Sequence, residues 1–228
     1  MTESEWLTSA TPWGMIDLVR ANNTRKLKLF VCACCRQVLN PFSPPLVERA
    51  VTASEMFADG EMSAATLGWV REAVGLAIAA ARDESQSGSG YTCHLLEACL
   101  LACGSGNQRQ AAQDAALATA RAAADLPWPA TGARPLEFAD ELAAQADLLH
   151  DIFGNPFRSA ELKPDWLTSD VLALARGIYA DRAFDRMPIL ADALQDAGCD
   201  DANLLGHCRE PGHHVRGCWV IDRLLGRT

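Results

Sequence analysis

The spacing of apolar residues constrains the fold most strongly, because almost every segment repeats with the period of an α-helix. One apolar stripe between residues 24 and 39 consists of Leu27, Phe30, Val31, Cys34 and Val38. These positions recur at i, i+3, i+4, i+7 and i+11, whereas a half-buried strand alternates every second residue. No Asn-Gly or Asp-Gly hairpin lies between alternating runs. The sequence therefore predicts an all-α protein.

Proline, glycine and asparagine divide this pattern into about nine or ten helices. Asn40 and Pro41 end the helix of residues 24–39, and Gly154 followed by Pro156 ends a later one. No unit of the length found in helical repeat proteins recurs convincingly along the chain. We therefore predict a compact multi-helix domain with no convincing repeat.

Composition divides the chain into three parts. Residues 1–84 and residues 136–228 carry strong helical patterns, whereas residues 85–135 combine Ser/Gly and Pro/Gly stretches with an alanine-rich segment. We expect this middle region to be the least constrained, with proteolysis starting in the linker 85–90 and the loop 126–135. Because short helices are marginally stable alone, we expect the C-terminal part to pack on the N-terminal part as one body.

Charge and composition exclude several classes of protein. The 228 residues contain 20 Lys and Arg against 29 Asp and Glu, a formal charge of −9. Such an acidic chain repels nucleic acid and anionic membranes. No apolar run is long enough to span a membrane, and the first residues do not resemble a secretion signal. With nine cysteines, an odd number, we expect reduced thiols and a cytoplasmic location.

Four long motifs occupy residues 25–36 (RKLKLFVCACCR), 151–158 (DIFGNPFR), 183–194 (AFDRMPILADAL) and 214–222 (HVRGCWVID). In these motifs the chain resembles an uncharacterised, multi-copy family of planctomycete bacterial proteins. The resemblance spans most of the chain outside the alanine-rich middle. It implies a bacterial protein, but it brings no activity, substrate or catalytic residue.

Cys32 and Cys35 form the first candidate site. Their C-x-x-C spacing is typical of zinc knuckles and thiol oxidoreductases. A thioredoxin-like redox site also needs a βαβ context, which the helical pattern lacks. The alternative interpretation is that these cysteines flank Cys34 as small apolar residues of the core. The sequence leaves both interpretations open and favours packing.

The second candidate site is a C-terminal group of cysteines and histidines, which consists of Cys199, His207, Cys208, His213, His214 and Cys218. A last helix that follows the turn at Pro211 and Gly212 and runs to about Leu225 places His214 and Cys218 one turn apart. Cys208 lies just before the Pro211-Gly212 turn, so it could approach them. The spacing matches no standard zinc finger. A zinc ion would therefore need a split site, which we predict to consist of Cys32, Cys35, Cys208, His214 and Cys218. The alternative is that His214 and Cys218 only form the buried stripe of the last helix.

Motifs of the common enzyme classes are absent from the sequence. It contains no G-x-S-x-G, no G-x-x-x-x-G-K-[ST] and no H-E-x-x-H. Our leading hypothesis is a non-enzymatic helical protein that acts through contacts with another protein and needs no cofactor. The first alternative is a zinc-binding protein with a structural or regulatory Cys/His site. The second is a thiol-dependent enzyme. We expect neither nucleic acid nor a membrane as a partner.

Overall fold

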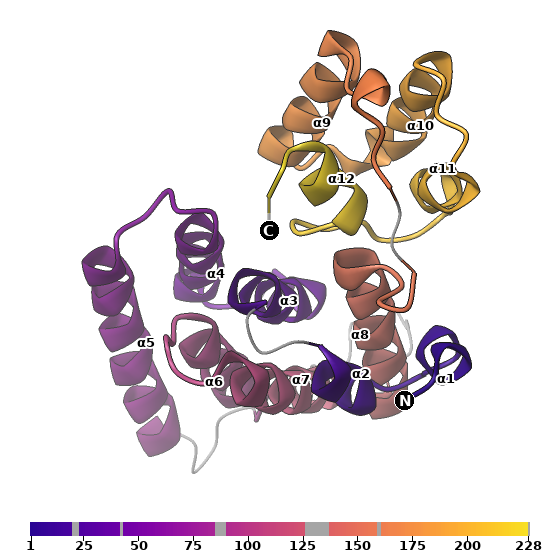
Figure 1. Cartoon of the computed structure of the whole chain (residues 1–228). Helices are drawn as coiled ribbons and strands as arrows, with labels where there is room; N and C mark the ends of the chain where they lie inside the picture. The colour runs from indigo at the N-terminus through magenta and orange to yellow at the C-terminus, as the bar shows by residue number, and fades with distance from the viewer. Residues whose placement is uncertain (20–22, 42, 85–89, 126–136, 159–160, 228) are drawn as a thin grey trace. The chain divides into compact units, whose positions relative to one another are not determined.

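The computed structural model describes residues 1–19, 23–41, 43–84, 90–125, 137–158 and 161–227 (Figure 1). Within these ranges the chain forms twelve α-helices and no strand, and nine of the helices have at least seven residues. The prediction of an all-α fold is therefore confirmed. The helices form two compact units, Met1–Leu149 (unit 1) and His150–Thr228 (unit 2).

Unit 1 is organised around α3. The helices that begin in this unit are α1 (Glu3–Leu7), α2 (Trp13–Leu18), α3 (Thr24–Gln37), α4 (Pro45–Ala58), α5 (Ala64–Glu84), α6 (Gly90–Ala102), α7 (Gln108–Ala124) and α8 (Phe138–Phe153). α3 packs against α4, α6 and α7, and every residue from Leu27 to Cys35 is buried. The predicted stripe is buried, but so are the residues between its members, because α3 has neighbours on several sides.

The buried Lys28 links α3 to the end of α6. Its ammonium donates hydrogen bonds of 2.6 Å to the carbonyl oxygens of Ala102 and Gly104. Carbonyls at the end of a helix have no partner within the helix, so a cation there is favourable. Burial lowers the pKa of Lys28, and the two carbonyls provide the hydrogen bonds that it loses with water.

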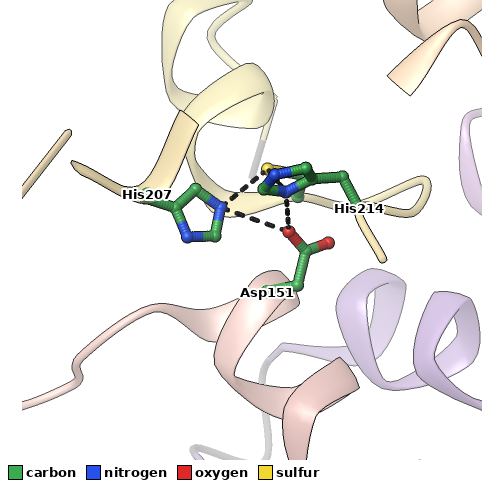
Figure 2. Close-up of side chains that lie close together, drawn as sticks. Asp151, His207 and His214 are labelled. Carbon is green, nitrogen blue, oxygen red and sulfur yellow. Dashed lines mark hydrogen bonds and ion pairs between the residues drawn. The ribbon is translucent and has the colours of Figure 1, made fainter. Parts of the chain in front are cut away.

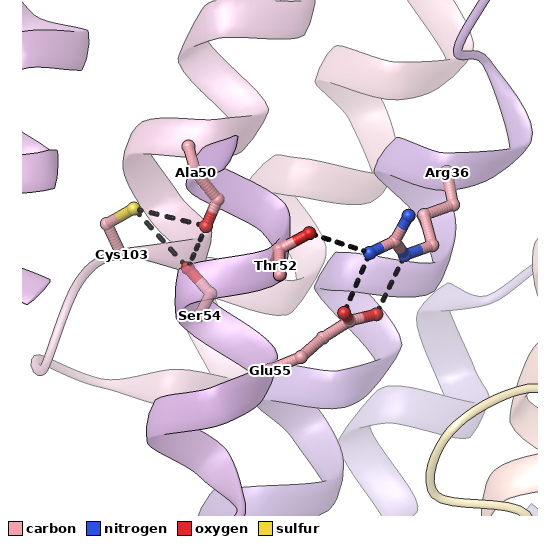
Figure 3. Close-up of polar contacts among 6 residues, drawn as sticks. All are labelled: Arg36, Ala50, Thr52, Ser54, Glu55 and Cys103. Atoms are coloured by element: carbon pink, nitrogen blue, oxygen red, sulfur yellow. Dashed lines mark hydrogen bonds and ion pairs between the residues drawn. The ribbon is translucent and has the colours of Figure 1, made fainter. Parts of the chain in front are cut away.

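Two ion pairs join α3 to α4. Arg36 donates from Nε and Nη2 to the two carboxylate oxygens of Glu55, at 2.8 Å each, and also contacts Thr52 (Figure 3). Near the start of α3, Arg25 contacts Asp59 at 2.8 Å. Because Glu55 is almost completely buried, its guanidinium partner is needed to offset the loss of water. The pairs fix the register of the two helices.

The middle region, residues 85–135, is the part of the chain that we expected to be the least constrained. Residues 85–89 and 126–136, which contain most of the two expected proteolytic sites, lie outside the described residues. The rest of the region forms α6 and α7, which pack closely against each other and against α3. Alanines line the buried face of α7, and their small side chains let neighbouring helices approach closely. The alanine-rich segment therefore packs within unit 1, although it contains few large apolar residues.

The α5 helix lies at the edge of unit 1, against α4 and α6 (Figure 1). Among the described residues, it is the one helix whose length and composition would allow it to cross a membrane, over Ala64–Arg82. The sequence pattern predicts a long helix here, from about Ser63 to Asp83, but no membrane span, because no uninterrupted apolar run is long enough. Its inner residues Leu67, Val74 and Ile78 are buried within unit 1. Packing of this kind is typical of the edge helix of a folded domain.

Unit 2 contains α9 (Ser169–Asp181), α10 (Met187–Asp196), α11 (Ala202–Arg209) and α12 (Trp219–Leu224) around one apolar core. The boundary lies at residue 150 rather than 136, because the first part of α8 packs with unit 1. Gln145, for example, donates hydrogen bonds to the Ala116 carbonyl and the Thr119 hydroxyl of α7. Joint folding of the two units as one body stays a prediction.

The last helix is shorter than predicted. It begins at Trp219 instead of near Gly212, and residues 210–218 are non-helical. Gly217 adopts a φ of +94°, which no right-handed helix contains and which L side chains rarely adopt. The expected i, i+4 helical arrangement of His214 and Cys218 is therefore wrong.

A first prediction concerns Cys34, which is fully buried in α3. Replacing its thiol by a hydroxyl (Cys34→Ser) leaves a buried polar group that needs a new partner. We expect the free energy of unfolding to fall by about 1–3 kcal/mol. Urea denaturation followed by circular dichroism measures this change. The half-buried Cys93 provides the control, because Cys93→Ser should change stability by less than about 0.5 kcal/mol. Equal effects of the two substitutions would contradict the argument.

A second prediction concerns Glu141, whose side chain is 1% exposed and accepts a hydrogen bond from Gln145. Burial raises the pKa of Glu141 from an ordinary 4.5 to about 7, although the Gln145 hydrogen bond lowers it. Between pH 4.5 and pH 7, Glu141 therefore keeps its proton in the folded state but has released it in the unfolded state. Stability must fall as the pH rises from 4.5 to 7, by about 3 kcal/mol from this group.

Glu141→Gln removes this proton equilibrium and keeps the shape of the side chain. We expect the free energy of unfolding of the variant to depend less on pH than that of the wild type between pH 4.5 and 7. Urea titrations at several pH values test this difference. The neighbouring Asp140 is exposed, so Asp140→Asn should keep the wild-type slope in that range. A Glu141→Gln slope equal to that of the wild type would contradict the raised pKa.

Candidate metal centre

Four potential metal ligands lie together in unit 2. Asp151 belongs to the last turn of α8, His207 to α11, and His214 and Cys218 to the segment between α11 and α12. One ligating atom from each side chain lies within 4.8 Å of the other three. Figure 2 shows both imidazole rings turned toward the Asp151 carboxylate. Three separate stretches of the chain thus contribute to one small volume.

The distances indicate convergence on a point. Nε2 of His207 lies 3.2 Å from Oδ1 of Asp151 and 3.3 Å from Sγ of Cys218. Nδ1 of His214 lies 2.6 Å from the same Oδ1 and 4.0 Å from the same Sγ. Tetrahedral zinc with ordinary bond lengths separates such ligand atoms by about 3.3–3.6 Å. Small shifts of the side chains would bring the four atoms to those separations.

The use of a single nitrogen distinguishes this cluster from a proton relay. In a catalytic triad, a histidine contacts the nucleophile through one ring nitrogen and the carboxylate through the other. Here each histidine directs the same nitrogen toward both the sulfur and the carboxylate. Nε2 of His214 is buried and has no hydrogen-bond partner among the described residues. The geometry is therefore that of ligands around one centre.

The backbone around the cluster holds its members in place. The second oxygen of Asp151 accepts a hydrogen bond of 2.9 Å from the Val215 amide, which fixes the carboxylate. Gly154 ends α8 with a φ of +63°, and an added Cβ would lie 3.0 Å from the Trp219 ring. The Trp219 ring in turn lies 5.3 Å from that of His207. Glycine is thus required where α8 meets the start of α12.

Electrostatics within the cluster favour a carboxylate and a neutral thiol. Burial raises the pKa of Asp151, but hydrogen bonds and positive charge from His207 and His214 outweigh it, so the pKa falls below its ordinary value. Burial and the nearby Asp151 raise the pKa of Cys218 well above its ordinary value. A bound metal cation would reverse this effect, because it supplies the charge that stabilises a thiolate.

The structure brings together two of the five residues predicted to bind metal. His214 and Cys218 meet through a turn rather than along a helix. Cys208 is buried in α11, and burial together with Asp151 raises its pKa to about 12. It is not a member of the cluster. The cluster instead contains His207, one residue earlier.

Cys32 and Cys35 belong to unit 1 and are fully buried in α3. Burial raises the pKa of Cys32, and the Glu55 charge raises it further. Neither cysteine belongs to a group of three or more ligating side chains in the described parts of the chain. Their burial favours the interpretation as small core residues. A split site that combines them with unit 2 stays a prediction.

Asp151 could not be predicted from the sequence, and His207 was not among the predicted ligands. No spacing rule connects Asp151 to the histidines, because it lies more than fifty residues before them. Only its position at the start of the DIFGNPFR motif singled it out. His207 was one member of the C-terminal group, and its choice requires knowing the direction of α11.

Comparison with protein-family models, curated proteins and solved structures finds no match for the chain.

The buried, protonated state of Cys218 leads to a third prediction. We expect Cys218 to react slowly with a thiol reagent at neutral pH, because attack requires an accessible thiolate. Cys93 should react first, since it alone among the nine cysteines is not buried. Mass spectrometry of the native protein after brief alkylation identifies the modified residue. Rapid labelling of Cys218 would support a thiol-dependent enzyme instead.

Proposed function

We propose that the protein binds one zinc ion in unit 2 and that the ion has a structural role. The observation that carries this proposal is the convergence of ligand atoms from Asp151, His207, His214 and Cys218 within 4.8 Å. Two nitrogens, a sulfur and an oxygen form a donor set that suits zinc, whereas calcium and magnesium require mostly oxygen ligands.

The number and burial of the ligands favour a structural role over a catalytic one. Structural zinc sites have four protein ligands, whereas catalytic sites keep one position for water or substrate. All four side chains are buried or nearly so; His207, the most accessible, is 15% exposed. An ion here would hold the end of α8, α11 and the segment before α12 together.

A structural ion is compatible with the leading hypothesis from the sequence. We propose a non-enzymatic protein that acts through contacts with other proteins, in the bacterial cytoplasm. The motifs that resemble the planctomycete family support a shared site, because three of the four ligands fall within them. Asp151 begins one motif, and His214 and Cys218 lie in another. If the resemblance reflects membership, we expect other members to bind zinc.

The fourth prediction is a stoichiometry near one zinc per chain. The full chain, purified without an affinity tag in reducing, chelator-free buffer, is analysed by inductively coupled plasma mass spectrometry. Cobalt added to metal-free protein should give absorption bands typical of tetrahedral coordination, together with a sulfur-to-cobalt band that Cys218→Ser removes. Zinc at a hundred times its Kd should raise the free energy of unfolding by about 2.7 kcal/mol.

His213 offers a matched control, because it is exposed and adjacent to the ligand His214. We expect His214→Asn to lower zinc affinity by at least tenfold and His213→Asn to leave it unchanged. At the same zinc concentration, the stability gained with zinc should fall to about half or less in the first variant only. A zinc content near zero, with no effect of added zinc on unfolding, would reject the proposal. Equal losses in both variants would reject the assigned ligands.

A further inference from the structure

A cleft of about 560 Å³ lies between α5, α6 and α7 of unit 1. Both α5 and α7 pack against α6, but they have few contacts with each other, so a space remains between them (Figure 1). Pockets that hold small molecules usually have volumes of about 300–1,000 Å³, so this space is large enough for a ligand. We call it the α5–α7 cleft.

The walls of the α5–α7 cleft are largely apolar and come from all three helices. They contain Ile78 of α5, Leu100 and Leu101 of α6, and Leu117 of α7. Ile78 is buried, whereas the three leucines are only partly buried and keep some contact with water. Because removal of apolar surface from water is favourable, a ligand with an apolar body that covers these leucines would stabilise the complex.

Four charged side chains also line the cleft, and three of them have partners within unit 1. Arg82 and Glu97 form an ion pair of 2.7 Å between α5 and α6. Asp114 accepts a hydrogen bond of 2.9 Å from Gln110. The guanidinium of Arg121 has no hydrogen bond or ion pair with any described residue. Its positive charge is therefore available to a ligand.

The order of the lining residues along α7 gives the cleft a direction. Asp114, Leu117 and Arg121 share one face of the helix, at i, i+3 and i+7, so the two charges are about 10 Å apart along the helix axis. A negative group is repelled at the Asp114 end and attracted at the Arg121 end, with the apolar Leu117 between them. The cleft therefore suits a molecule with an apolar body and one anionic end.

We propose that the α5–α7 cleft binds a small amphipathic monocarboxylate, such as a medium-chain fatty acid. Its carboxylate contacts Arg121, and its alkyl chain lies against Leu100, Leu101 and Leu117. A guanidinium suits this role, because it binds a carboxylate through two parallel hydrogen bonds. The inference goes beyond the proposed zinc site and does not depend on it, since the cleft and the metal centre belong to different units.

Charge favours a monocarboxylate over other small ligands. A nucleotide or another polyanion needs several free cations, but Arg82 is already paired with Glu97. A cationic amphiphile gains less than an anion, because Asp114 already accepts a hydrogen bond whereas Arg121 has no partner. A neutral apolar molecule leaves Arg121 without a partner, so it should bind more weakly than a carboxylate of equal chain length.

An NMR titration of the full, ¹⁵N-labelled chain with decanoate tests the proposal. We expect saturable shifts of amide signals from α5, α6 and α7, with a Kd of about 0.1–1 mM, which is usual for a ligand of this size. Decan-1-ol has the same chain without the charge and should bind at least about threefold more weakly. Decyltrimethylammonium, which has the opposite charge, should bind more weakly still.

Substitutions on α7 separate the contribution of the charge from that of the apolar wall. Arg121→Gln should lower the affinity for decanoate at least about threefold and leave that for decan-1-ol unchanged. Arg49→Gln is the matched control, because Arg49 is exposed and lies outside the cleft, on α4. Leu117→Gln makes the wall polar and should weaken both ligands. Circular dichroism checks that each variant keeps the helical fold, which partly or fully exposed positions should allow.

Four results would overturn the proposal. The absence of saturable shifts at about ten times the expected Kd rejects the cleft as a site for this ligand. Shifts confined to other helices place the site elsewhere. Equal affinities for decanoate and decan-1-ol, or an unchanged affinity in Arg121→Gln, reject the contact with Arg121. Tighter binding of decyltrimethylammonium rejects the anionic class. A chain without zinc leaves the titration interpretable, so the two proposals can fail separately.

Discussion

Burial of α3 on several sides is the constraint on which unit 1 depends. Nine successive residues, from Leu27 to Cys35, lose contact with water, so each side of the helix needs a packed neighbour. α4, α6 and α7 provide those neighbours, and α5 packs on α4 and α6 in a second layer. The one charged residue in the run, Lys28, is tolerated because two carbonyls at the end of α6 accept its hydrogen bonds. Small cysteine and alanine side chains in α3 let these helices lie close together.

In unit 2 the corresponding constraint is the buried carboxylate of Asp151. A buried charge needs several partners, and this one contacts two imidazoles and the Val215 amide. These contacts bring together residues more than fifty positions apart, which no single helix of unit 2 can do. The same contacts leave three atoms facing one point, namely Nε2 of His207, Nδ1 of His214 and the Cys218 sulfur. The arrangement that satisfies a buried charge thus also forms a site suited to a cation.

The sequence predicted the helical class because apolar periodicity is a local property, and the α3 stripe followed from it directly. The packing of the middle region could not be predicted, because alanine gives a weak periodic signal although it lines the buried face of α7. The residues of the candidate metal centre could be predicted only in part. His214 and Cys218 are close in sequence, but Gly217 with a positive φ replaced the expected helix by a turn. The position of Asp151 beside the histidines depends on how the end of α8 packs against the last segments of the chain. No local sequence pattern predicts that packing.

Cys218 is the residue that distinguishes a metal centre from a cluster held together by hydrogen bonds alone. A neutral thiol is a weak hydrogen-bond donor, so it contributes little to holding two histidines and a carboxylate together. If hydrogen bonds alone held the cluster together, each ring nitrogen should face a different partner, because one N–H group forms a good hydrogen bond with one acceptor. The observed sharing of a single nitrogen between sulfur and carboxylate leaves the thiol without a strong interaction. A cation at the point of convergence gives all four side chains a favourable partner at once, and the cysteine then has a physical role.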